Sequence, residues 1–233
     1  MSRKRKKFLV FNEPDRKAPF LLRAEFHKAL VKEGIIEEIL VDDDRIEVDE
    51  KSVTAKLKQI KIIELKDSDR KSQVERIWRV NLEKEIPGIS TGSKTPEVAL
   101  LVLENFSAGN YRLTIILIEL KSSLQNRELL NIKEKLRCAM NRLYLLMSLN
   151  NHGNPSQGYD LATINVNFKG AIFYSRNNIQ ASKITEPEER EVYDILTKTP
   201  RSGQLRCSTL LNDNDPIEIK FFDQQTVCLK DLL

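Results

Sequence analysis

The stretch "LTIILIELKSS", residues 113–123, decides the fold, because a nearly continuous apolar run ends abruptly in charged and polar residues. Strands that are apolar on both faces are normally covered on both faces, so the run predicts a central strand of a sheet. The stretch "VALLVLE" at 98–104 has the same character, and "NFSAGN" between the two has the Gly and Asn content of a hairpin loop. The two runs therefore predict a central hairpin with a substantially antiparallel sheet around it.

The segments on either side of this hairpin alternate between helical and extended patterns. Apolar residues recur at helical spacing in four segments, and we expect helices at 20–33, 73–86, 127–149 and 186–198. Shorter β-type runs predict two strands within 34–49 and further strands at 57–67, 162–176 and 217–223. The sequence therefore predicts a mixed α/β (α+β) protein with a central mixed sheet flanked by helices.

Composition places the chain among globular proteins with a real core. The chain has 233 residues, of which 40% are hydrophobic and 31% charged. No apolar run reaches the roughly 18–20 residues that a membrane span needs, so we expect no membrane partner. The N-terminus lacks the apolar stretch of a secretory signal, and Cys138, Cys207 and Cys228 lack the spacing of a disulfide framework or a zinc site. We expect a cytoplasmic protein.

Net charge by itself does not identify a nucleic-acid-binding protein, because 38 basic residues face 34 acidic ones. Basic side chains nevertheless gather in an N-terminal arm, which could gain affinity for nucleic acid by displacing counterions from phosphates. The alternative interpretation of the arm is a solvated terminus. The residues of the arm are Arg3, Lys4, Arg5, Lys6 and Lys7.

The charged end of the central strand is the first candidate site. Side chains alternate along a strand, so Glu119 and Lys121 point to the same face, where burial is costly unless they find partners. A divalent cation and a phosphate would be such partners, with the lysine orienting or deprotonating a water or stabilising developing charge. In an antiparallel hairpin the start of the first strand lies beside the end of the second. Glu97 should therefore lie near Glu119, whereas Glu104 should lie at the hairpin tip.

The Glu-x-Lys pattern occurs twice more in the chain. Glu64 and Lys66 end a more polar strand candidate that follows the acidic block 41–50, and they form a rival site. Glu218 and Lys220 have no following helix, so we reject that copy. All three copies have a second interpretation as strand ends whose charged side chains reach solvent.

With these residues placed, residues 73–175 resemble the PD-(D/E)xK nuclease superfamily. The shared order is a helix, a strand opened by Pro96 and Glu97, a strand ending in Glu119 and Lys121, a helix and a strand. The resemblance implies a restriction-endonuclease-like core at 71–233 behind an α+β extension at 1–70. It also implies hydrolysis of nucleic-acid phosphodiester bonds with Mg²⁺ or Mn²⁺ held by Glu97 and Glu119, and with Lys121 aiding catalysis. The family usually has Asp where this chain has Glu97, which shifts the metal by about one methylene.

The resemblance suggests further contacts. The family often adds a glutamate from an upstream helix, for which Glu75 and Glu83 are candidates, and Ser122 and Gln125 are candidate phosphate donors. We expect nucleic acid as the partner, with DNA favoured over RNA. Whether the chain also forms a homodimer or binds a protein partner stays open. The alternative function is a noncatalytic nucleic-acid- or protein-binding module on the same core. A basic set in the long helix would face nucleic acid or, alternatively, form a solvated face balanced by Glu128 and Glu134: Arg127, Lys133, Lys135, Arg137 and Arg142.

Overall fold

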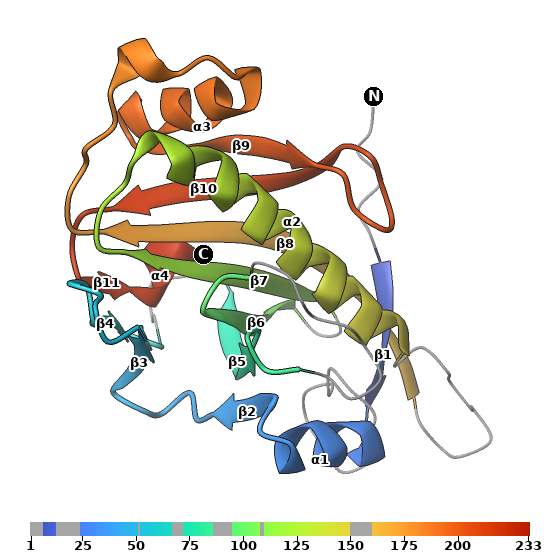
Figure 1. Cartoon of the computed structure of the whole chain (residues 1–233). Helices are drawn as coiled ribbons and strands as arrows, with labels where there is room; N and C mark the ends of the chain where they lie inside the picture. Colours follow the sequence, from blue (N-terminus) through green and yellow to red (C-terminus); the bar gives the residue numbers. More distant parts are fainter. Residues whose placement is uncertain are drawn as a thin grey trace.

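The computed structural model describes residues 7–12, 24–50, 52–66, 72–85, 95–107, 110–149 and 160–233. Within these ranges the chain forms an eight-stranded sheet in the order β2-β5-β6-β7-β8-β10-β9, with β1 paired to β8, and a three-stranded sheet β11-β4-β3 (Figure 1). The strands of the large sheet are β1 (Lys7–Asn12), β2 (Ile36–Ile39), β5 (Gln73–Asn81), β6 (Val98–Ser107), β7 (Asn110–Lys121), β8 (Asp160–Tyr174), β9 (Ser202–Cys207) and β10 (Asp215–Phe222). Those of the small sheet are β3 (Arg45–Asp49), β4 (Gln59–Ile63) and β11 (Thr226–Cys228). The helices are α1 (Ala24–Lys32), α2 (Asn126–Leu149), η2 (Ala181–Lys183), α3 (Pro187–Thr197) and α4 (Leu229–Leu232).

The predicted hairpin forms the middle of the large sheet. β6 pairs antiparallel with β7, with Leu101 opposite Ile115, and β5 pairs antiparallel with β6 on the other side. The chain then crosses over through α2, so β8 lies parallel to β7, and β10 lies parallel to β8. The expected mixed α/β class with a central mixed sheet is confirmed, and the finer restriction-endonuclease-like assignment stays a prediction.

The large sheet is covered on both faces, which explains why β7 is apolar on both. Ile115 and Leu117 of β7 lie in a core formed with α2 and α3, whereas Ile116, Ile118 and Leu120 lie in a second core with the small sheet and α4. In Figure 1, α2 crosses in front of β7 and β8, while β3, β4, β11 and α4 lie on the other side. A strand buried on both faces needs apolar residues at every position, and only its end is free to carry charge.

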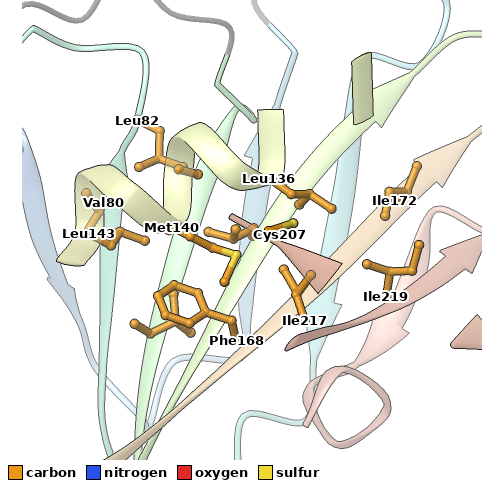
Figure 2. Packing of buried hydrophobic residues seen from close by; sticks show 14 of the residues in the cluster. Val80, Leu82, Leu136, Met140, Leu143, Phe168, Ile172, Cys207, Ile217 and Ile219 are labelled. Atoms are coloured by element: carbon orange, nitrogen blue, oxygen red, sulfur yellow. The ribbon is translucent and has the colours of Figure 1, made fainter. Parts of the chain in front are cut away.

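The position of α2 over the sheet is fixed by close packing. Figure 2 shows Met140 and Leu143 of α2 above Phe168 of β8, with Leu136 of α2 facing Ile172 of β8. Gly170 of β8 permits this approach, since a Cβ there would lie 2.9 Å from Ile219 Cγ2 and 3.3 Å from Leu136 Cδ1. The Arg142 guanidinium donates to the carbonyl oxygens of Leu82 and Lys84 and so ties α2 to the turn after β5. The rotation of α2 about its axis, which decides which of its side chains face the end of β7, is therefore set by the core.

The predicted helix at 73–86 is wrong, because this segment forms β5 and the turn after it. The register shifts between Val74 and Arg76, as at a β-bulge, and Val74 and Ile77 consequently face the same core although they are three residues apart. Trp78 and Val80 face the other core. An irregular strand thus gives the same spacing of apolar residues as a helix.

The other predicted helices and strands form close to their expected positions. α2 and α3 match two of the expected helices, and α1 occupies the described part of 20–33. The segment 34–49 contains two strands, as predicted, although β2 pairs with β5 in the large sheet and β3 pairs with β4 in the small one. β1, β9, β11 and α4 were not predicted, since β9 is a polar edge strand and β11 has only three residues.

Segments from both sides of residue 70 share sheets. β1 pairs with β8, β2 pairs with β5, and β4 pairs with β11. Nothing in these pairings sets a boundary at residue 70, and the division into 1–70 and 71–233 stays a prediction. Across the described ranges, no helix is long and apolar enough to cross a membrane.

Candidate functional site

Glu97 and Glu119 meet where β6 begins and β7 ends. The register pairs Val98 with Ile118, so Glu97, one residue before β6, comes beside the last residues of β7. The Leu120 N–H donates a hydrogen bond to Glu97 Oε2 at 2.8 Å. Glu104 lies at the other end of the same hairpin, opposite Arg112. The structure therefore brings together the two carboxylates that the topology of the hairpin suggested.

Glu119 is almost wholly buried, with 1% of its surface exposed, on the face of the sheet that α2 covers. Its Oε1 accepts from the Lys121 ammonium at 2.8 Å and from the Lys135 ammonium of α2 at 2.7 Å. Its Oε2 is buried and has no hydrogen-bond partner among the described residues. Buried polar atoms are nearly always hydrogen-bonded, so an unpartnered carboxylate oxygen calls for a water, a proton or a ligand.

Lys121 bridges two carboxylates. Besides Glu119, its ammonium contacts Glu128 Oε2 of α2 at 2.8 Å. Burial disfavours the charged ammonium, but the hydrogen bonds and charges of Glu119 and Glu128 outweigh burial and raise the pKa of Lys121. Lys121 is therefore firmly protonated and serves as a fixed positive charge.

Glu97 has a much higher pKa than an ordinary exposed glutamate. Burial, followed by the negative charge of Glu119, raises the pKa of Glu97 to about 9, against the opposing effects of Lys135 and of the hydrogen bond from the Leu120 N–H. At neutral pH the carboxyl group of Glu97 consequently holds a proton. Two neighbouring carboxylates forced together in this way commonly mark a functional site.

The donor set at this edge fits a magnesium or manganese ion. Mg²⁺ is commonly held by one or two carboxylates together with waters and phosphate oxygens of the substrate. Glu119 supplies one such carboxylate, whose Oε2 has its acceptor capacity unused, and Glu97 supplies a second once it loses its proton on metal binding. The described residues contain no group of three or more His, Cys, Asp or Glu side chains arranged to hold a metal ion. Any ion here would therefore take its remaining ligands from water and substrate.

Two residues of the cluster were not predicted in their observed roles. Lys135 was expected to face nucleic acid or solvent, and Glu128 to balance charge on a solvated helix face. They lie seven residues apart on α2, which places both on the same side of the helix, above the end of β7. That spacing was the available signal, although only the packing of α2 shows that this side faces the sheet.

Ser122 and Gln125 do not join the cluster. The Ser122 hydroxyl oxygen accepts from the backbone N–H groups of Lys56 and Leu57, at 2.6 and 3.3 Å, and so holds the segment before β4 against the end of β7. Gln125 is exposed, and its carbonyl oxygen accepts from the Glu128 N–H as α2 begins. Ser122 is thus a structural tie, with its oxygen already in use.

Glu75 and Glu83, the candidate helical acids, do not lie on a helix. Glu75 belongs to β5 and accepts from Asn105 Nδ2 at 3.1 Å, near the end of β6 that is remote from Glu97. Glu83 is exposed on the turn after β5, at the same end of the sheet as Glu97. Of the basic arm, residues 3–6 lie outside the described residues, and Lys7 begins β1.

Most of the basic residues on α2 have protein partners. Lys133 pairs with Glu191 of α3 at 2.9 Å, and the Arg127 guanidinium lies 3.4 Å from Glu128. Arg142 is buried against the turn after β5, whereas Arg137 is exposed. Lys133, Lys135 and Arg142 are thus used within the fold, whereas Arg127 and Arg137 are exposed, and the choice between a nucleic-acid-binding face and a solvated face stays open for these two.

The two other Glu-x-Lys copies have different surroundings. Glu64 has a φ of 53° and lies 3.4 Å from Lys230, while Lys66 pairs with Asp42, all with side chains about half exposed or more. On β10, Glu218 pairs with Lys169 at 3.1 Å, and Lys220 donates to the Asp231 carbonyl oxygen. Neither copy shows the pairing of two neighbouring carboxylates found at Glu119.

Comparison with known proteins adds no relative to this description. No family model matches the chain, and neither the curated proteins nor the solved structures contain a match to it.

Proposed function

We propose that the protein is a metal-dependent nuclease that hydrolyses phosphodiester bonds of nucleic acid, with DNA as the favoured substrate. The observation that carries the proposal is the pair Glu97 and Glu119 at the ends of adjacent strands, with Glu119 Oε2 lacking a partner. Placing the half-buried Glu97 beside the buried Glu119 costs free energy, and a divalent cation would offset that cost. Glu97 and Glu119 would hold Mg²⁺ or Mn²⁺, which when bound supplies a polarised phosphate oxygen and an activated water.

The lysines divide the remaining work. Because Lys121 holds its proton firmly, we assign it the stabilisation of negative charge that develops on the phosphate, rather than the removal of a proton from water. Lys135 contacts the same oxygen of Glu119 and fixes the orientation of that carboxylate. Of the roles that the sequence left open for Lys121, the contacts thus favour electrostatic stabilisation.

The arrangement of strands supports the same proposal. A meander of β5, β6 and β7 followed by α2 and a parallel β8 places the first acid at the start of one strand and Glu-x-Lys at the end of the next. We propose a restriction-endonuclease-like core on this basis. The departure from the usual pattern is that the expected helix before the meander is absent from 73–86, where β5 forms instead.

A second candidate function is favoured by the burial of Glu119. A carboxylate that is 1% exposed and held by two lysines also suits a closed structural ion-pair network. The protein would then be a noncatalytic module that binds nucleic acid or a protein on the same core. Cleavage measurements distinguish the two functions.

The deciding experiment is nicking of supercoiled plasmid with Mg²⁺ or Mn²⁺, compared between the wild type and the variants Glu119→Gln and Lys121→Met. We expect metal-dependent nicking that falls by about 10²–10³-fold in each variant, since removal of one group that stabilises charge in the transition state typically costs that much. Circular dichroism confirms that each variant is folded. Matched controls are Glu64→Gln and Lys66→Met, which change the same motif at exposed positions and should leave nicking unchanged.

Two outcomes would contradict the proposal. Nicking that persists undiminished in Glu119→Gln and Lys121→Met would place the activity elsewhere. Absence of cleavage of plasmid, single-stranded DNA and RNA with both metals would favour the noncatalytic module.

A further inference from the structure

A cavity lined by lysines lies on the small sheet, separate from the two carboxylates. Its volume is about 360 Å³, and its lining comes from the segment before β4, from β4 itself and from the start of β11. Every lining side chain is polar and none is acidic. The lining residues are Lys56, Lys58, Gln59, Lys61, Gln225 and Thr226.

The positive charge of this cavity is largely available to a ligand. The Lys58 ammonium donates to the carbonyl oxygens of Ser52 and Val53 at 2.8 and 2.6 Å, contacts that orient the ammonium without neutralising it. Lys56 is exposed, and within the described part of the chain neither Lys56 nor Lys58 has a carboxylate partner. An ammonium that is held by carbonyl groups and open to solvent is well placed to bind an anion.

Lys61 is balanced only in part. Its ammonium lies 4.0 Å from Glu47 Oε1, an oxygen that also accepts from the Arg45 guanidinium at 2.8 Å. The lysine and the arginine together exceed the charge of this one carboxylate. A second carboxylate lies beside the cavity, because Gln59 of the lining donates to Asp49 Oδ1 at 2.8 Å. The three lysines of the lining and Arg45 still outnumber Glu47 and Asp49, so the surface around the cavity is more positive than negative.

The cavity is connected to the end of β7, the strand that carries Glu119 and Lys121. The backbone N–H groups of Lys56 and Leu57 donate to the hydroxyl of Ser122, the residue that follows Lys121. Figure 1 shows β4 and β11 beside the end of β7, on the side of the large sheet away from α2. Glu119 lies on the α2 side of that strand. The lysine cavity and the carboxylate pair thus lie on opposite faces of the sheet but at one shared edge.

We propose that the lysine cavity binds backbone phosphates of a nucleic-acid strand and holds that strand across this edge of the sheet. The inference rests on the proposed function, for which it supplies a substrate-binding surface. Ammonium groups neutralise phosphates independently of base sequence, and the Thr226 hydroxyl adds a hydrogen-bond donor. The cavity has no apolar side chain to insert into a membrane, so nucleic acid fits its chemistry better than an anionic lipid surface does.

The test measures binding and not cleavage. Fluorescence polarisation follows a labelled 20-nucleotide DNA, single-stranded and as a duplex, titrated with the full chain in EDTA at several salt concentrations. We expect the variant with Lys56→Gln and Lys58→Gln to bind about tenfold more weakly at 100 mM salt than the wild type does. We also expect its log–log salt slope to fall by about 2, since each phosphate contact contributes about one unit to the slope.

Two matched variants make this result specific. Lys28→Gln with Lys32→Gln removes the same charge from exposed positions on α1 and should bind like the wild type. Lys56→Arg with Lys58→Arg keeps the charge and should also bind like the wild type. Thermal melting verifies that all three double variants are folded.

Three outcomes would overturn the inference. They are the absence of wild-type binding at 50 mM salt, equal losses in the two glutamine variants, and binding to phosphatidylserine vesicles in place of DNA. None of these depends on cleavage, so the two proposals fail separately. Loss of nicking in Glu119→Gln with binding indifferent to Lys56 and Lys58 would overturn only the inference. Lysine-dependent binding without any nicking would overturn only the nuclease.

Discussion

Two buried carboxylates lie at opposite ends of the β6–β7 hairpin, and their surroundings differ sharply. Glu104 is 0% exposed and Glu119 is 1% exposed, so burial by itself does not distinguish them. Glu104 accepts from the Ser72 hydroxyl on Oε1, and from the Arg112 guanidinium and the Thr114 hydroxyl on Oε2. Both of its oxygens are used by donors that belong to the fold.

Glu119 has the opposite pattern. Both of its lysine partners contact Oε1, its Oε2 has no hydrogen-bond partner among the described residues, and a second carboxyl group, Glu97, lies beside it. A buried carboxylate that the fold satisfies completely stabilises structure, whereas one with unused capacity beside a second carboxyl group is typical of a functional site. The number of donors, rather than burial, therefore makes Glu119 and not Glu104 the candidate for a functional carboxylate.

The sharpest way to break this comparison is to remove each carboxylate in turn. Glu104→Ala leaves a cavity and removes the acceptor of two buried hydroxyls, those of Ser72 and Thr114, and of the partly exposed Arg112 guanidinium. We expect it to lower the free energy of unfolding by about 3–5 kcal/mol. Glu119→Ala removes a buried charge whose Oε2 has no donor among the described residues and leaves Lys121 paired with Glu128, so its loss should be less than half as large. Urea denaturation of both variants in EDTA measures the difference. Equal losses would mean that Glu119 is as structural as Glu104.

The second prediction concerns Glu97 and pH. In the unfolded chain Glu97 loses its proton near its ordinary pKa of 4.5, whereas the folded protein retains it up to about pH 9. Folding stability is therefore lost as pH rises between these values, by up to about 1.4 kcal/mol per pH unit. Glu97→Gln cannot titrate and still accepts from the Leu120 N–H, so it should become progressively more stable than the wild type from pH 5 to pH 8.5.

Urea titrations at pH 5.5, 7.0 and 8.5, all in EDTA, test this dependence. A difference between Glu97→Gln and the wild type that stays constant across the three values would show that Glu97 does not titrate in that range. The matched control is Glu83→Gln, at the same end of the sheet but exposed, for which we expect no such growth.

The hairpin and its acid pair were predictable because both follow from local rules. Runs that are apolar at every position need cover on both faces, and an antiparallel hairpin fixes which acid meets Glu119. β5 was not predictable, because its bulge places Val74 and Ile77 on one face at helical spacing. The inward positions of Glu128 and Lys135 depend on how α2 is rotated over the sheet. That rotation is set by distant contacts such as Gly170 with Leu136 and cannot be read from the helix by itself.

The third prediction sharpens the comparison within α2. Lys133 and Lys135 have equally exposed side chains, 19% each, but Lys133 pairs with the 36%-exposed Glu191 and Lys135 with the 1%-exposed Glu119. Lys135→Met removes a hydrogen bond to a buried charge and should cost about 1–2 kcal/mol of stability. Lys133→Met should cost about 0.5 kcal/mol, as for a pair open to solvent. Equal losses in urea denaturation would show that the burial of Glu119 adds nothing to its bond with Lys135.

The smallest effect is expected at the motif copy in the small sheet. The side chains of Glu64 and Lys66 are 52% and 63% exposed, and their partners Lys230 and Asp42 are similarly open to solvent. Glu64→Gln and Lys66→Met should therefore change the free energy of unfolding by no more than about 0.5 kcal/mol, because ion pairs in solvent contribute little.

The same two variants test which Glu-x-Lys copy is active when their nicking is compared with that of Glu119→Gln. The same Glu-x-Lys letters sit at a strand end in both places, and only the second carboxylate and the missing donor distinguish them. Loss of nicking at Glu64 with full activity in Glu119→Gln would mean that counting donors selected the wrong copy.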